Sequence, residues 1–73
     1  MSEAQSLSNA EIDLKVSELL GKISDLREEL SIAEEEIEDR YARDIRSTFI
    51  RTMITRANSK LRNLVRLRQQ RQN

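Results

Sequence analysis

The sequence contains no cysteine, no histidine and no proline, and it has a single glycine among its 73 residues. Without cysteine or histidine, neither disulfides nor the usual zinc ligands can stabilise the fold. General acid–base catalysis most often uses histidine, and an activated nucleophile needs a positioned base that cannot be assembled here. We therefore expect no enzyme, no metal or other cofactor, and no small-molecule substrate.

Aromatic residues and long apolar runs are also scarce. Tyr41 and Phe49 are the only aromatic side chains, while 37% of the residues are hydrophobic and 36% are charged. This balance is typical of long helices, and strands and turns lack the residues they favour. No apolar run approaches the roughly 18 residues of a membrane span, and the N-terminus lacks the basic start and apolar core of a signal peptide. We expect an all-α, intracellular protein that contacts no membrane.

The first predicted helix begins with a capping signal. Ser8-Asn9-Ala10-Glu11 matches the capping box, so residues 1–8 are predicted to be disordered and a helix to start near Asn9. The apolar residues that follow are spaced alternately by four and three, which is the heptad pattern of a coiled coil. These residues are Ile12, Val16, Leu19, Ile23, Leu26, Leu30, Ala33 and Ile37. Gly21 does not disturb the phase, and we interpret it as a weak point or a site of close approach.

A second heptad seam follows, out of phase with the first. It comprises Ile50, Ile54, Ala57, Leu61 and Leu64. Between the two seams, apolar residues recur every fourth position, at Ile37, Tyr41, Ile45 and Phe49. A step of four rotates the apolar stripe around a helix, as a stutter does in a coiled coil. The register is therefore predicted to shift near residues 39–48.

Two architectures are compatible with this shift. One is a helical hairpin that turns within residues 39–48, and the other is a single bent helix of about 60 residues. The lack of glycine and proline there favours continuity, whereas Asp44, Ser47 and Thr48 could each cap a new helix. We favour a break within Arg40–Ser47. The polar residues 69–73 are predicted to fray.

The charges are divided between the two halves of the chain. Residues 1–39 carry twelve acidic and three basic side chains, whereas residues 40–73 carry ten basic and one acidic. The net charge of zero therefore hides an acidic helix over 9–39 and a basic helix over 40–68. Folding back near Tyr41 would place the acidic cluster 34–39 beside Arg43, Arg46 and Arg51. Such exposed pairs select orientation more than they supply stability.

The apolar surface is wider than a two-stranded seam needs. Adjacent apolar pairs such as Leu19-Leu20 and Phe49-Ile50 indicate that the helices pack on more than one side. We therefore predict a partner-binding seam that completes a multi-helix bundle, either with other proteins or with further copies of the chain. It comprises Ile12, Val16, Leu19, Ile23, Leu26, Leu30, Ile37, Tyr41, Ile45, Phe49, Ile50, Met53, Ile54, Leu61 and Leu64.

The basic half supports a different hypothesis. Nine of its ten basic residues are arginine, which suits bidentate contact with phosphates or carboxylates. Arg62, Arg66 and Arg68 are the candidates for contact with nucleic acid or an acidic partner. Against nucleic acid stand the lack of stacking aromatics, the neutral total charge and the competing acidic half. The basic block also follows the acidic heptads, whereas in a basic-region leucine zipper it would precede them.

One part of the chain resembles a known family. The segment IEDRYARDIR at residues 37–46, followed by Ile50-Arg51-Thr52-Met53, is similar to the N-terminal segment of Borealin and of short Borealin N-terminal-like proteins. The resemblance covers roughly residues 12–54. The chain lacks the proline that usually separates the two helical elements in this family, and Ser47, Thr48 and Phe49 stand there instead.

The resemblance implies a subunit of the chromosomal passenger complex. Such a subunit would pack with the helices of an INCENP-type scaffold and a Survivin-type BIR protein, and would help target Aurora kinase during chromosome segregation. It implies location in the nucleus, at centromeres and on the spindle. The implied bundle contacts are Ile23, Leu26, Leu30, Ile37, Tyr41 and Ile45, with Ile50, Arg51 and Met53 on the far side.

Overall fold

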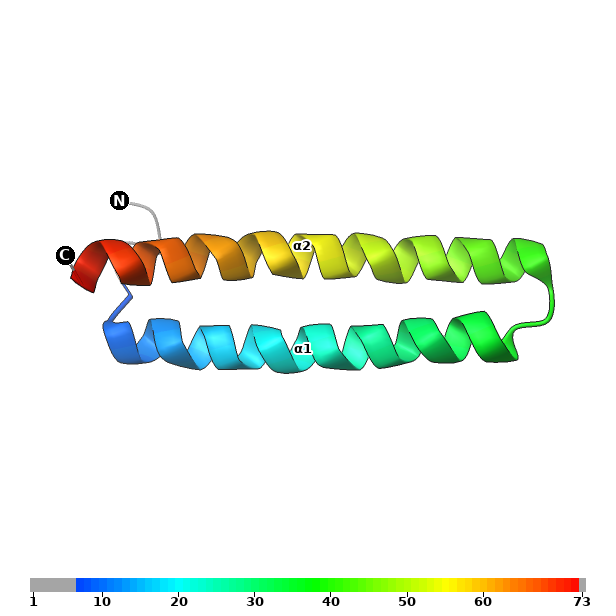
Figure 1. The fold of residues 1–73 in the computed structure, drawn as a ribbon, viewed down its shortest axis with the longest axis horizontal. Helices are drawn as coiled ribbons and strands as arrows, with labels where there is room; N and C mark the ends of the chain where they lie inside the picture. Colours follow the sequence, from blue (N-terminus) through cyan, green and yellow to red (C-terminus); the bar gives the residue numbers. More distant parts are fainter. Residues whose placement is uncertain (1–6, 73) are drawn as a thin grey trace.

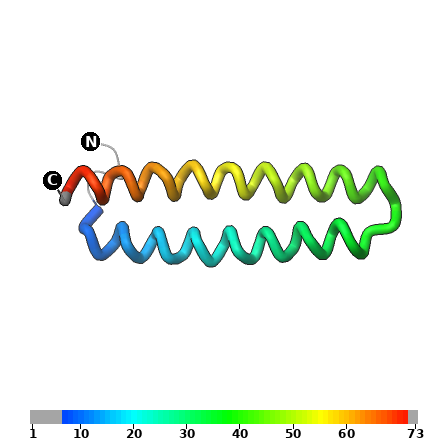
Figure 2. Tube along the Cα trace, in the orientation of Figure 1, coloured from blue at the N-terminus to red at the C-terminus, as the bar shows by residue number. Residues whose placement is uncertain are grey.

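The chain folds as a hairpin of two antiparallel helices (Figures 1 and 2). The computed structural model describes residues 7–72. Helix α1 runs from Asn9 to Glu36, and helix α2 runs from Arg40 to Gln72. Residues 37–39 form the connection between them. Of the two predicted architectures, the all-α hairpin is therefore confirmed, and the described residues contain no strand.

The first heptad seam forms the inner face of α1. Ile12, Ile23, Leu26 and Ala33 are buried, and the other four members of the seam are half-buried. Because a strict alternation of four and three keeps one stripe of a helix facing one neighbour, all eight residues reach the same side. The first neighbour of this acidic helix is consequently the second half of its own chain.

The inner face of α2 is a heptad seam that begins with polar residues. It comprises Arg43, Ser47, Ile50, Ile54, Ala57, Leu61, Leu64 and Arg68, all of them buried or half-buried. Ile50 is only 1% exposed and clusters with Leu26 and Ala33. Ser47 is 8% exposed, and its hydroxyl has no hydrogen-bond partner. The seam thus keeps one phase along the helix, although its first two members, Arg43 and Ser47, are not hydrophobic.

This phase corrects the predicted stutter. Tyr41, Ile45 and Phe49 are 75%, 54% and 57% exposed, so they do not continue the seam between the helices. Their spacing of four indicated a rotating apolar stripe, but Arg43 and Ser47 occupy the inward positions of this part of α2. The apolar pattern therefore pointed to the outer face of this part of α2, because the residues on its inner face are polar.

The turn lies at residues 37–39, before the segment Arg40–Ser47 in which we expected it. The side chain of Asp39 accepts a hydrogen bond from the Tyr41 amide at 3.3 Å, and its carbonyl accepts one from the Arg43 amide at 2.9 Å. Asp39 therefore caps α2. Three consecutive glutamates end α1, where the negative end of the helix dipole disfavours acidic side chains. Both effects place the break earlier than the candidate caps Asp44, Ser47 and Thr48.

Ion pairs connect the acidic and the basic helix. Arg51 pairs with Glu34 at 2.8 Å, as the charge pattern predicted, while Arg46 pairs instead with Glu29 at 3.9 Å. These side chains are about half exposed, so each pair contributes no more than about 1 kcal/mol. The pairs select the antiparallel arrangement, and the apolar seam supplies most of the stability.

The ends of the helices differ slightly from the predicted boundaries. Ser8 is the N-cap of α1, and residues 1–6 of the predicted disordered segment lie outside the described residues. The acidic helix ends at Glu36 instead of residue 39. Helix α2 continues to Gln72, so the described part of the tail 69–73 is helical.

Gly21 is a weak point in α1 and not a site of close approach within the hairpin. A Cβ added there would meet no atom within 4 Å. Gly21→Ala is therefore expected to raise the free energy of unfolding by roughly 0.5–1 kcal/mol, because alanine loses less backbone entropy in a helix. Urea unfolding followed by circular dichroism measures this change. A lower stability would mean that another element of the assembled protein needs the space beside Gly21.

Candidate protein-interaction surface

The described residues contain no cluster of metal-ligating side chains and no helix suited to crossing a membrane. No group of three or more acidic side chains within residues 7–72 is placed to hold a metal ion. Neither α1 nor α2 contains a stretch apolar and long enough to cross a membrane. The features that remain are surfaces: an apolar stripe, three grooves and several charged clusters.

The apolar stripe lies on α2 and runs from its outer face to the edge of the seam, where its last member packs against the core. We use this name for Tyr41, Ile45, Phe49 and Met53, which follow one another at intervals of four residues. The first three are more than half exposed, and Met53 is half-buried. In a heptad pattern one turn takes about 3.5 residues, so each step of four residues goes slightly beyond one full turn. The stripe therefore moves obliquely from the outer side of α2 towards one flank.

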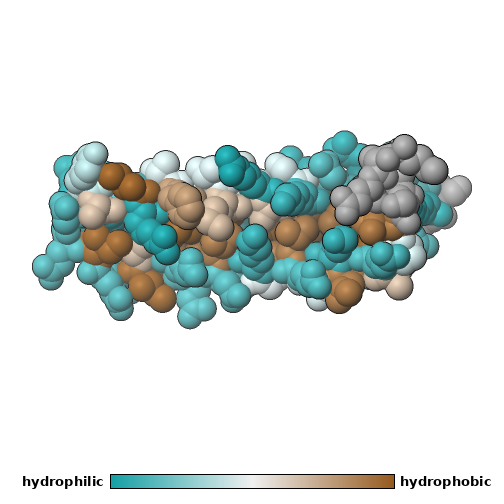
Figure 3. Space-filling model, turned by 180° about the vertical axis from the view of Figure 1, so that it is seen from behind, coloured by the Kyte–Doolittle hydropathy of each residue, from teal (hydrophilic) through white to brown (hydrophobic). Residues whose placement is uncertain are grey.

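A shallow groove follows the apolar stripe. It is lined by Tyr41, Asp44, Ile45, Thr48, Phe49, Thr52, Met53 and Arg56. Figure 3 shows hydrophobic residues reaching the surface over both helices, several of them near the loop end, which is on the left in that view. On α1, Leu14 and Ile32 are also exposed, at 61% and 46%. Single exposed apolar residues are common, so the contiguous row along α2 is the candidate interaction surface.

A second groove lies nearer the chain termini, and we call it the lysine groove. It is lined by Leu7, Lys15, Glu18, Leu19, Lys22, Lys60, Asn63 and Leu64. Leu19 and Leu64 belong to the seams of α1 and α2, so the groove lies along the contact between the helices. Its three lysines are the only lysines in the sequence. Sequence reasoning missed this site because the lysines are far apart along the chain.

The opposite flank of the hairpin is polar and carries an ion pair. A groove there is lined by Glu34, Arg43, Asp44, Ser47, Thr48 and Arg51. The pair between Glu34 and Arg51 lies within it. Leu20 and Val65 are exposed on this side, at 54% and 38%. Neither residue lines the groove of the apolar stripe. This flank therefore offers less apolar surface to a partner.

The three arginines predicted to contact phosphate are in different environments. Arg68 is half-buried at the end of the seam and pairs with Asp13 at 3.1 Å. Arg62 and Arg66 are exposed, and no ion pair of theirs occurs within residues 7–72. The cluster is thus reduced to two free arginines, because the acidic helix holds the third.

Most of the predicted partner-binding seam is already packed within the hairpin. The members on α1, together with Ile37, face α2, and those from Ile50 onwards face α1. Of the fifteen predicted residues, only Tyr41, Ile45 and Phe49 are left mainly exposed. These three are the part of the predicted seam that a partner could reach without opening the hairpin.

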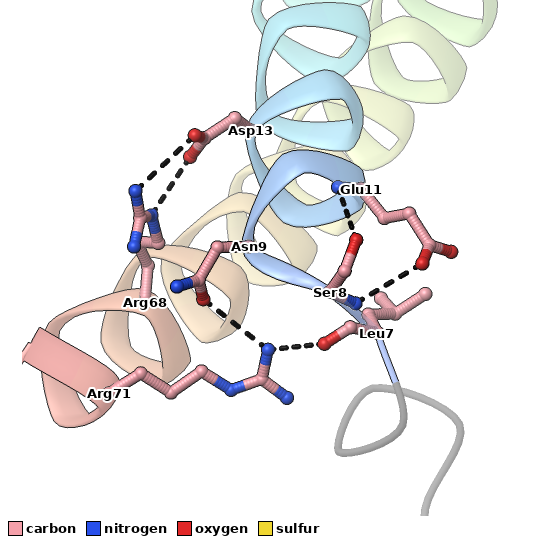
Figure 4. A network of polar contacts seen from close by, with 7 residues as sticks. All are labelled: Leu7, Ser8, Asn9, Glu11, Asp13, Arg68 and Arg71. Atoms are coloured by element: carbon pink, nitrogen blue, oxygen red, sulfur yellow. Dashed lines mark hydrogen bonds and ion pairs between the residues drawn. The ribbon is translucent and has the colours of Figure 1, made fainter.

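A polar network closes the end of the hairpin where the termini meet (Figure 4). Arg68 bonds Asp13 on α1, and Arg71 donates hydrogen bonds to the carbonyl of Leu7 and the side chain of Asn9. Two arginines of the last turns of α2 therefore attach to the first turn of α1. The network fixes the ends of the helices relative to each other and so shapes the lysine groove beside them.

The same end contains the predicted capping box. The Glu11 amide donates to the Ser8 hydroxyl at 3.1 Å, and the Ser8 amide donates to the Glu11 carboxylate at 3.2 Å. The hydrogen bond from the Ser8 amide, and then that from its side chain, lower the pKa of Glu11 below its ordinary value. The box is thus strongest when Glu11 is ionised.

Taken together, the fold and its surfaces define a two-helix hairpin with an apolar stripe and one basic groove on its outside. No protein-family model matches the chain, and the comparisons with curated proteins and with solved structures found no match either.

The capping box gives a pH dependence with a definite sign. Because the pKa of Glu11 is lower in the folded chain, the box stabilises the helix start above the ordinary carboxyl pKa, and this contribution is lost as the pH falls through the folded value. Ser8→Ala keeps the hydrogen bond from the residue 8 amide and removes only the hydroxyl, so it should raise the pKa of Glu11 part of the way towards its ordinary value. An NMR titration of the Glu11 carboxyl measures this, with Ser17→Ala on exposed α1 surface as the control. An unchanged pKa in Ser8→Ala would contradict a contribution from the Ser8 side chain.

Proposed function

We propose that the chain is a non-catalytic helical scaffold or adaptor subunit, whose hairpin supplies two helices to a larger bundle formed with protein partners. One observation carries the proposal. After the helices have packed on each other, the apolar stripe on α2 is still exposed, with Ile45 and Phe49 more than half accessible. A partner helix that covered this stripe would remove that surface from water.

The energetics support an assembled state. Full burial of an isoleucine or phenylalanine side chain is worth about 1.5–3 kcal/mol, so covering the remaining surface of the stripe is a substantial gain for a small protein. Chains of this size bury too little apolar surface to be comfortably stable alone, and the sequence has no cysteine for disulfides. Association is the stabiliser that remains.

A finer proposal follows from the resemblance to Borealin N-terminal segments. The matching residues 37–46 cover the turn and the start of α2, and they include two members of the apolar stripe, Tyr41 and Ile45. In this proposal the partners are INCENP-type and Survivin-type helices of the chromosomal passenger complex, located at centromeres and on the spindle. The family bundle takes one helix from each protein, whereas this chain would bring a hairpin.

Two other functions have less support. Binding of nucleic acid would rely on Arg62 and Arg66, since Arg68 is paired with Asp13. Self-association into a dimer of hairpins would use the same apolar stripe, but it would bring the basic helix α2 of one copy close to that of another if the stripes met directly. Both are distinguished from the adaptor function by the partners recovered in the following experiment.

The test compares substitutions of two residues that are equally exposed. Ile45 and Leu20 are each 54% exposed, but only Ile45 belongs to the apolar stripe. The tagged chain and its Ile45→Asp and Leu20→Asp variants are expressed in their own cell, and bound proteins are quantified by mass spectrometry. Ile45→Asp should reduce recovery of the partners by about tenfold or more, because it places a charge in the interface. Leu20→Asp should leave recovery unchanged.

Circular dichroism of the purified variants verifies that both stay helical. Equal recovery from Ile45→Asp and the parent chain would contradict the proposed interface. Recovery of INCENP-type and Survivin-type proteins would support the finer proposal, whereas stripe-dependent recovery of unrelated proteins would retain the adaptor function and reject that assignment.

A further inference from the structure

The lysine groove brings together positive charges from both helices. Lys15 and Lys22 lie two turns apart on α1, and Lys60 faces them from α2. No ion pair involves any of the three within residues 7–72. Glu18 is the only acidic residue that lines the groove. The lining therefore carries a net positive charge, although Glu11, one turn before Lys15 on α1, acts on that lysine electrostatically.

This arrangement is the reverse of the contacts elsewhere between the helices. Glu29 meets Arg46, Glu34 meets Arg51 and Asp13 meets Arg68, so an acidic residue of α1 opposes an arginine of α2 each time. In the lysine groove, lysines of α1 oppose a lysine of α2. Like charges across a helix contact disfavour that contact, and a partner of opposite charge would relieve the repulsion.

The floor of the groove is apolar. Leu7, Leu19 and Leu64 line it, and each of them is half-buried. An apolar floor with a positive rim matches an amphipathic helix that presents leucine-like residues flanked by glutamate or aspartate. Arg56, one turn before Lys60, lines the groove of the apolar stripe and extends the positive rim towards the loop.

We propose that the lysine groove binds an acidic amphipathic helix of a protein partner, packed against both α1 and α2. The proposal rests on the adaptor function and adds the chemistry of the partner. Apolar residues of the bound helix cover Leu19 and Leu64, and its carboxylates pair with Lys15, Lys22 and Lys60. Two copies of the chain would not dock groove to groove, because two lysine grooves that met face to face would oppose six lysines.

The test uses a synthetic helix of about four heptads with leucine at positions a and d and glutamate at e and g. Repulsion between its glutamates limits its self-association. A matched peptide has lysine at e and g. Binding of each peptide to the full-length chain is measured by isothermal titration calorimetry, at about 50 and about 500 mM salt. The glutamate peptide should bind, more weakly at the higher salt, and the lysine peptide should not.

Two charge-reversal variants locate the binding site. Lys22→Glu/Lys60→Glu should weaken binding of the glutamate peptide by about tenfold or more. Arg62→Glu/Arg66→Glu makes the same change in net charge at residues outside the groove, and it should weaken binding by less than about threefold. Circular dichroism establishes that both variants keep their helices. Equal weakening by the two variants, or no binding of the glutamate peptide, would overturn the proposal.

Sedimentation of the chain alone tests the competing occupant. A dimer that Lys22→Glu/Lys60→Glu dissociates would show that a second copy fills the groove, and this too would overturn the proposal. Neither failure affects the adaptor function, which depends on the loss of partners in Ile45→Asp. Conversely, loss of the glutamate peptide from Lys22→Glu/Lys60→Glu would support the groove even if Ile45→Asp kept its partners.

Discussion

The antiparallel packing of one heptad seam on another is the interaction on which this molecule depends. The chain has no disulfide and no histidine or cysteine to bind a metal, so the burial of residues such as Leu26 and Ile50 between two helices holds it together. That burial also determines which apolar side chains remain on the surface. Once the inner faces are used, the apolar stripe on α2 and the floor of the lysine groove are two of the apolar surfaces that another helix could cover, beside single exposed residues such as Leu14 and Leu20.

The charges between the helices and the charges in the lysine groove have different consequences. Between the helices, acidic residues of α1 meet arginines of α2, which favours folding back over pairing of two parallel chains. In the lysine groove three lysines outnumber the single glutamate, Glu18, and none of the lysines forms an ion pair within residues 7–72. A sequence with no net charge can therefore carry a groove with a net positive charge, because its acidic and basic residues are not evenly distributed.

The sequence was sufficient to predict the helices, the capping box, the first seam and the orientation imposed by charge, since all of these depend on local spacing or on long runs of one sign. It was insufficient where the inward positions are polar. Arg43 and Ser47 continue the seam of α2, but hydrophobicity pointed to Tyr41 and Ile45 on the outer face. The lysine groove could not be predicted, because Lys60 joins Lys15 and Lys22 only through the turn at residues 37–39.

The most direct test of the account is the distance between the two ends of the chain in solution. The sequence has no cysteine, so Ala10→Cys and Gln70→Cys give two unique sites for spin labels. Both positions are exposed on the outer sides of their helices. Because packed helix axes lie about 10 Å apart and a helix with its side chains is about 10–12 Å wide, pulsed electron paramagnetic resonance should find the labels separated by roughly 20 Å. Dilution with unlabelled chain should not change the distance distribution. A distance near the ~90 Å of a continuous helix, or a short distance that disappears on dilution, would contradict the hairpin.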